Sequence, residues 1–164
     1  MKLRLAQVVE DSIVDGPGLR LAVFVQGCGH HCPGCHNPGS HDPLGGYQGD
    51  TDDLLPLLDN PMLGGVTLTG GEPFEQPQPL ALLAREAQAR GLTVWTYTGF
   101  VLEQLLASPD PHVAQLLTHT DVLVDGPFVL ARRSLALTFR GSDNQRMIDL
   151  PATLAGRTVV LLEE

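Results

Sequence analysis

Residues 21–35 read LAVFVQGCGHHCPGC, an apolar run that leads directly into a loop holding every cysteine of the chain. The three thiols, of Cys28, Cys32 and Cys35, follow the spacing C-x3-C-x2-C. An odd number of cysteines on one short loop excludes a disulfide framework, so the pattern predicts a metal centre. Thiolates suit both iron–sulfur clusters and zinc. Three of them can hold three irons of a [4Fe–4S] cluster and leave the fourth iron open to a substrate.

Zinc is the alternative that the same loop leaves open, because one imidazole would complete a Cys3His site. Three neighbouring histidines could supply that imidazole: His30, His31 and His36. Zinc fingers usually place a second ligand pair further along the chain, whereas only scattered histidines follow here: His41, His112 and His119. The spacing therefore favours iron–sulfur over zinc. His30 and His31 could tune a bound cluster through hydrogen bonds, or could simply be solvated.

Composition narrows the classes of function that remain. The chain has 164 residues, 43% of them hydrophobic, which is enough for one domain over residues 1–164. Its net charge of -9 disfavours nucleic acid as a partner, because phosphate binding needs a basic face. No stretch is apolar enough to predict a membrane span, and no apolar signal segment is present. We therefore expect a protein of the reducing cytoplasm.

Apolar runs alternate with helical patterns along the chain. Four runs have the continuous apolar character of strands buried on both faces of a parallel sheet: 21–25, 66–69, 92–97 and 122–124. Four segments have helical periodicity: 50–58, with Asp50 or Thr51 as N-cap, 79–90, 100–107 and 111–118. This alternation predicts an α/β protein with a parallel sheet and right-handed crossovers. A full eight-unit barrel needs roughly 250 residues, so we expect a partial, open parallel β/α barrel.

Each predicted strand ends in a polar or glycine-rich segment. These segments are the cysteine loop, Gly70–Pro73, Thr98–Gly99 and Asp125–Pro127. Because parallel strands deliver their carboxyl ends to one edge of a sheet, we expect the four segments to lie together. Gly70 and Gly71 would let the backbone approach a ligand closely, and Pro73 would fix the exit. Backbone carbonyls and the Glu72 carboxylate would be acceptors for an ammonium group.

These motifs carry a resemblance to a known family. The cysteine spacing at the end of one strand, followed by GGEP at the end of the next, resembles the radical S-adenosylmethionine superfamily. DGPGLR at 15–20 and FVQGC at 24–28 resemble the activating enzymes of glycyl radical enzymes. Three further motifs, with the cysteine loop, resemble the family that activates anaerobic (class III) ribonucleotide reductase: TYTGF at 96–100, VLVDGPF at 122–128 and RGSDNQR at 140–146. This resemblance covers about residues 11–150.

The resemblance implies roles for particular residues. The three cysteines would hold three irons, and the fourth iron would take the amino and carboxylate groups of S-adenosylmethionine. Residues Gly70, Gly71, Glu72 and Pro73 would receive the methionine ammonium, and Gly34 and His36 would lie near the adenine. Asp125 would meet the ribose or the ammonium, unless it is only a turn residue. Asp15 and Arg20 could form an ordinary ion pair, and residues 140–146 an ordinary turn.

The family's chemistry implies a partner as well. A reduced cluster would cleave S-adenosylmethionine, and the 5′-deoxyadenosyl radical would take a hydrogen atom from a glycine of the reductase. A one-electron donor such as a flavodoxin-like protein would reduce the cluster. Two alternatives remain at this point. One is another small radical S-adenosylmethionine enzyme, which activates a different glycyl radical enzyme or modifies a deazapurine. The other is a zinc or electron-transfer module.

Overall fold

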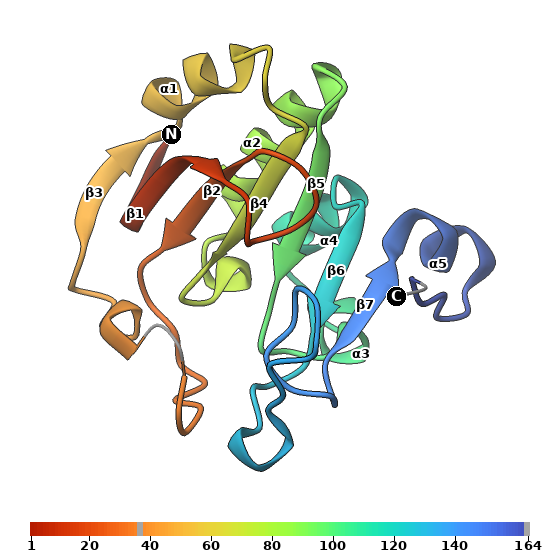
Figure 1. Ribbon diagram of the computed structural model, residues 1–164. Coiled ribbons are helices and arrows are strands. Elements are labelled where there is room, and N and C mark those ends of the chain that lie inside the picture. The colour runs from red at the N-terminus through yellow and green to blue at the C-terminus, as the bar shows by residue number, and fades with distance from the viewer. Residues whose placement is uncertain (36–37, 163–164) are drawn as a thin grey trace.

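A mixed sheet of seven strands forms the centre of the described protein (Figure 1). The computed structural model describes residues 1–35 and 38–162. The strand order across the sheet is β3-β1-β2-β4-β5-β6-β7. The strands are β1 (Lys2–Ser12), β2 (Arg20–Val25), β3 (Tyr47–Asp50), β4 (Gly65–Gly70), β5 (Thr93–Tyr97), β6 (Val122–Asp125) and β7 (Arg146–Asp149).

The four central strands confirm the predicted parallel sheet. β2, β4, β5 and β6 pair in parallel, with Phe24 opposite Thr69 and Trp95 opposite Val122. The expectation of a purely parallel sheet was wrong for the three outer strands, because β1, β3 and β7 pair antiparallel with their neighbours. Antiparallel strands can leave one face in water, so they lack the continuous apolar run that marks a central parallel strand. The observed fold class is therefore mixed α/β.

Helices connect the parallel strands and confirm all four predicted helical segments: 111–118 has the predicted bounds, 79–90 is shifted to 77–89, and the other two are shorter. The helices are α1 (Thr51–Leu54), α2 (Pro77–Ala89), α3 (Leu102–Leu106), α4 (Pro111–Thr118) and α5 (Leu150–Gly156). The predicted helix 50–58 divides into α1, capped by the Asp50 carboxylate, and a 3-10 segment, Leu55–Asp59. Three other 3-10 segments are Pro38–Ser40, Pro73–Glu75 and Leu130–Arg132. Helix α5 was not predicted.

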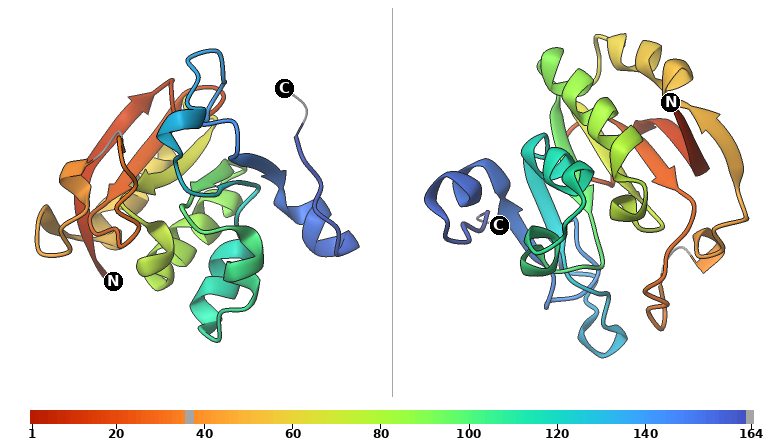
Figure 2. Two further views of the ribbon diagram at one scale, coloured as in Figure 1. Left: turned by 90° about the horizontal axis from the view of Figure 1, so that it is seen from below. Right: turned by 180° about the vertical axis from the view of Figure 1, so that it is seen from behind.

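The larger hydrophobic core lies on one face of the sheet, and a smaller cluster of Trp95, Val122, Val124 and Met147 lies on the other. Strand residues such as Leu21, Leu68 and Leu123 are at most 1% exposed and pack against Leu83 of α2 and Leu116 of α4. Figure 2 shows α2 and α4 together on this face. The opposite face instead meets the loop after β1 and the segment between β6 and β7 (Figure 1). Within the described residues, no helix has the length and apolar character that a membrane span requires.

Arg20 anchors the loop after β1 to the uncovered face of the sheet, which is the face opposite α2 and α4 and carries neither of these helices. Its guanidinium is 1% exposed and donates five hydrogen bonds, all to neutral oxygens. The acceptors are the carbonyls of Pro17, Val66 and Thr93 and the hydroxyls of Thr67 and Thr93. Burial lowers the pKa of Arg20 to about 10.

The ion pair considered between Asp15 and Arg20 is not formed among the described residues. The Asp15 carboxylate accepts a hydrogen bond from the Ser12 hydroxyl at 2.6 Å, and the Asp15 carbonyl accepts one from Thr67. Arg20 therefore acts on Asp15 through the backbone, by holding the turn at Pro17. A planar guanidinium suits this task because it directs five donors in fixed directions.

We expect Arg20→Lys to lower the free energy of unfolding by about 2–4 kcal/mol, because the ammonium has three donors and leaves buried carbonyls unsatisfied. Urea denaturation of the metal-free protein measures this loss. Arg85→Lys is the matched control, since Arg85 has an exposed side chain on α2 and should change stability by no more than about 0.5 kcal/mol. Equal stability of the two variants would contradict the anchoring role of Arg20.

Candidate functional site

The cysteine loop leaves the carboxyl end of β2 and faces the ends of the neighbouring strands. Cys28, Cys32 and Cys35 are half-buried. All three line a cavity of about 120 Å³, together with Gly70 and Gly71 after β4. Thr98 and Gly99 after β5 and Gly126 after β6 complete the same lining. The four segments expected at one edge of the sheet therefore do converge.

Two predicted site residues on the loop have different outcomes. Gly34 lies at φ +73°, a left-handed conformation that favours glycine, and a Cβ there would come within 2.8 Å of Leu130. The cysteine loop thus packs against the segment that follows β6. His36 lies outside the described residues, so its expected place near an adenine stays a prediction.

The Glu72 carboxylate is buried and joins three segments of the site. It is 0% exposed and accepts hydrogen bonds from the backbone N–H of Gly99 at 2.8 Å and of Phe74 at 2.9 Å. The Thr98 hydroxyl lies 2.9 Å from both carboxylate oxygens, and His30 Nε2 lies 2.6 Å from one of them. The hydrogen bond to Glu72 raises the pKa of His30, although burial of the ring opposes this shift.

These contacts give Glu72 a structural role. Its oxygens bind donors from the cysteine loop, from the segment after β5 and from its own turn, so the side chain holds the site together. The expected contact of Glu72 with an ammonium group stays a prediction. Pro73 is buried and begins a 3-10 turn directly after Glu72.

The glycines of the site permit close approach between segments of the chain. A Cβ on Gly71 would lie 2.2 Å from the carbonyl oxygen of Gly27, and a Cβ on Gly70 would lie 2.6 Å from the backbone nitrogen of Val25. A Cβ on Gly99 would lie 2.6 Å from the His30 ring. The packing of the chain is therefore sufficient to require glycine at these positions. The expected close approach of a ligand to Gly70 and Gly71 stays a prediction.

Asp125 is buried at the end of β6 and is engaged by its own chain. Its carboxylate is 0% exposed and accepts hydrogen bonds from Arg146 Nε at 3.0 Å and from the backbone N–H of Leu102 at 2.8 Å. Arg146 also reaches Glu103 at 2.9 Å, and both carboxylates raise the pKa of the guanidinium. This arrangement gives Asp125 a positioning role between β7 and α3, and a contact with ribose or ammonium stays a prediction.

The 140–146 segment fixes the loop that follows β6. The Gln145 side chain donates to the Gly126 carbonyl and accepts from the backbone of Gly141 and Ser142. Asn144 donates to the Pro127 carbonyl at 2.8 Å. Residues 144–146 thus bind residues 125–127 one after another. The segment is more than an ordinary turn, because it shapes the edge of the site.

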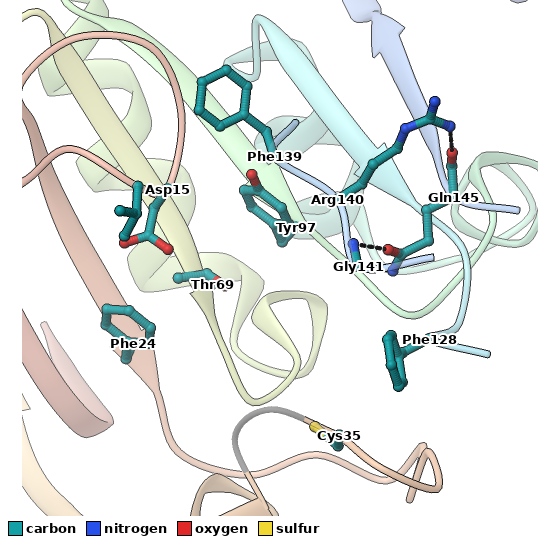
Figure 3. A pocket seen from close by; sticks show the side chains of 11 residues that line it. Asp15, Phe24, Cys35, Thr69, Tyr97, Phe128, Phe139, Arg140, Gly141 and Gln145 are labelled. Atoms are coloured by element: carbon teal, nitrogen blue, oxygen red, sulfur yellow. Dashed lines mark hydrogen bonds between the residues drawn. The ribbon is translucent and has the colours of Figure 1, made fainter. Parts of the chain in front are cut away.

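A second cavity, of about 340 Å³, extends from the cysteine loop over the uncovered face of the sheet (Figure 3). It shares Cys35, Thr69, Tyr97, Phe128 and Gln145 with the smaller cavity. Asp15 and Phe24 lie along one side in Figure 3, and Phe139 and Arg140 along the other. Burial raises the pKa of Tyr97 well above its usual range, so its hydroxyl stays protonated. The space is large enough for part of a substrate beside the cysteines.

The charge around the thiols is negative. Burial raises the pKa of the Cys28 thiol, with further contributions from the carboxylates of Glu72 and Glu75. Glu75 also accepts a hydrogen bond from the backbone N–H of Gly29 at 3.0 Å. Within residues 1–35 and 38–162, no three His, Cys, Asp or Glu side chains gather closely enough to hold one metal ion.

Comparison with known proteins agrees with this site. Residues 14–148 match the model of the 4Fe-4S single cluster domain family. The anaerobic ribonucleoside-triphosphate reductase-activating protein of Salmonella typhi is 36% identical over 152 residues, which cover 87% of this chain and 96% of that protein. The chain belongs to this family of activating proteins. The Escherichia coli K12 member is 35% identical, and the match covers 81% of this chain and 90% of that protein. The phage T4 member is 32% identical, and the match covers 82% of this chain and 86% of that protein.

Among solved structures, the crystal structure of QueE from Escherichia coli is similar at a TM-score of 0.47 and 18% identity. The match covers 60% of this chain and 53% of QueE.

Several site residues of this activating-protein family member escaped prediction from sequence. Phe128 lies within a quoted motif, but nothing in the sequence placed its ring at both cavities. Phe139 packs edge-on against Trp95 at 5.3 Å between ring centroids, a contact across 44 positions that no local pattern signals. His41 lines the small cavity with the cysteines, and its position shortly after the loop was the available signal.

The pair of His30 and Glu72 should show energetic coupling. We expect a double-mutant cycle of His30→Phe and Glu72→Gln to give a coupling energy of about 1–3 kcal/mol, because each change alone leaves the other buried group short of a partner. Urea unfolding of the metal-free protein measures the cycle. A cycle of His112→Phe with Glu72→Gln is the control and should be additive within about 0.5 kcal/mol, because His112 lies on α4 and bonds to Gln115. Additivity in the first cycle would show that the contact does not fix the loop.

Proposed function

We propose that this protein activates an anaerobic ribonucleoside-triphosphate reductase as an iron–sulfur enzyme that reductively cleaves S-adenosylmethionine and generates a glycyl radical on the reductase. One observation carries the proposal: in a member of the activating-protein family, the chain's three cysteines line one cavity with the carboxyl ends of β4, β5 and β6. The seven-stranded sheet would be the open barrel of the radical S-adenosylmethionine type, in a single domain over residues 1–164.

The residues at the site fit a [4Fe–4S] cluster. The three cysteines are half-buried and line one cavity, and the sequence holds no further cysteine. One iron of a four-iron cluster would thus lack a thiolate and remain open to S-adenosylmethionine. When bound, the cluster would supply the electron that cleaves S-adenosylmethionine, whose fragment then removes a hydrogen atom from a glycine of the reductase.

The chain's own residues would bind and orient S-adenosylmethionine. Cys28, Cys32 and Cys35 would hold the irons, and backbone groups of residues 70–73 would receive the methionine ammonium. Glu72 would keep these groups in place by binding both the cysteine loop and the segment after β5. Gly34 and His36 would lie toward the adenine, and Asp125 would position the segment after β6 through Arg146.

The larger cavity would receive the reductase. It opens on the face of the sheet without helices and begins at Cys35. Its aromatic side chains, Phe24, Tyr97, Phe128 and Phe139, offer apolar contact to a protein segment. A flavodoxin-like protein would serve as electron donor. A second protein closing this side would exclude water and oxygen from the site.

The proposal predicts release of 5′-deoxyadenosine that needs the cluster. The protein would be reconstituted anaerobically with iron and sulfide and mixed with S-adenosylmethionine and a strong one-electron reductant. Each of Cys28→Ala, Cys32→Ala and Cys35→Ala should lower product release to the level without enzyme, because a thiolate ligand is lost. Glycyl radical formation on the reductase, followed by electron paramagnetic resonance, should fall in parallel.

A control variant separates loss of the cluster from damage to the loop. His31→Asn changes an exposed loop residue at φ +52°, a conformation that asparagine tolerates, and should keep both activities. Preserved cleavage in any cysteine variant would overturn the proposal. A wild-type protein that binds zinc without sulfide would also overturn it and would support the metal-binding alternative.

A further inference from the structure

The segment that follows the cysteine loop returns beside the start of that loop. The Gln26 side chain is 4% exposed and donates to the carbonyls of Gly39 at 3.0 Å and Asp42 at 2.7 Å. The backbone N–H of Gly27 donates to the Ser40 carbonyl, and that of Cys28 donates to the His41 carbonyl at 3.1 Å. These bonds fix His41 next to the first cysteine of the site.

The His41 ring belongs to the lining of the small cavity, together with all three cysteines. Its Nε2 is shielded from solvent and has no hydrogen-bond partner within the described residues. The ring is also held from outside by His31, whose ring meets it edge-on at 5.7 Å between centroids. A buried polar atom without a partner is costly, so such an atom in a native structure calls for an explanation.

Among the described residues that line this cavity, only His41 has a buried side-chain nitrogen or oxygen without a hydrogen-bond partner. Two other buried side-chain atoms lack partners in the described part of the chain, Arg4 Nε and Asn144 Oδ1, and neither residue lines the cavity. The unpartnered imidazole therefore coincides with the place where the proposed function puts sulfur atoms. Neutral imidazole can carry its proton on Nε2 and donate it to an acceptor.

We propose that His41 Nε2–H donates a hydrogen bond to a sulfur of the [4Fe–4S] centre and thereby raises its reduction potential. The inference rests on the proposed function, because it needs the cluster. Reduction adds an electron to a site already flanked by the carboxylates of Glu72 and Glu75, which disfavour further negative charge. A donor directed at sulfur stabilises the reduced cluster more than the oxidised one, and hydrogen bonds to sulfur are an established means of setting such potentials.

Two substitutions of His41 distinguish the effect of its N–H donor from the effect of its aromatic ring. His41→Phe keeps an aromatic ring and removes the N–H, whereas His41→Gln removes the ring and keeps a side-chain N–H at a similar reach. Each variant would be reconstituted anaerobically, and its iron and sulfide content would be measured first. A potentiometric titration without S-adenosylmethionine, followed by electron paramagnetic resonance of the reduced cluster, would then give the midpoint potential. His112→Asn is the control, because His112 lies on α4 and lines neither cavity of the site.

We expect a more negative midpoint potential in His41→Phe, and potentials near that of the wild type in His41→Gln and His112→Asn. If His41→Phe retains less iron and sulfide, His41→Gln should restore both. An unchanged potential in His41→Phe at full cluster content would overturn the inference. A Gln variant as impaired as the Phe variant would overturn it too, because ring shape would then matter rather than the donor. A wild-type protein without a cluster would instead refute the proposed function itself.

Discussion

A buried carboxylate sets the geometry of the site. Glu72 is removed from solvent, and a charge in that position is tolerated only when donors surround it. Its donors come from three places in the sequence: His30 in the cysteine loop, Thr98 and Gly99 after β5, and Phe74 in its own turn. The loops after β2, β4 and β5 are therefore fixed relative to one another by one side chain. The glycines at positions 71 and 99 follow from this packing, because a Cβ at either would collide with the cysteine loop.

Two further polar networks complete the arrangement. Residues 144–146 bind residues 125–127 and hold the segment after β6 against the site. Arg20 holds the loop after β1 over the uncovered face of the sheet through five neutral acceptors. The apolar core lies on the opposite face, beneath α2 and α4. The loops of the site are thus shaped by hydrogen bonds at the carboxyl ends of the parallel strands, away from the main apolar core.

The central strands and the helices between them could be predicted from sequence, whereas the outer strands and the contacts of Glu72 could not. Continuous apolar runs predicted the four parallel strands, and helical periodicity predicted α1, α2, α3 and α4, with Asp50 or Thr51 as N-cap of the first. β1 escaped prediction because it has no continuous apolar run, and β7 because it has only four residues. The burial of Glu72 escaped prediction, because its donors His30, Thr98 and Gly99 lie far from it in the sequence.

The sequence by itself determined that three thiols share one loop, that this loop follows a buried strand, and that polar segments end the other parallel strands. These features depend on local order along the chain, where spacing and apolar pattern suffice. Only the tertiary structure decided that Glu72 and Asp125 are hydrogen-bonded by their own chain, and that His41, whose Nε2 has no partner among the described residues, lines the same cavity as the thiols. Hydrogen bonds between residues far apart in sequence determine such matters, because burial and partner count depend on how the strands and loops come together.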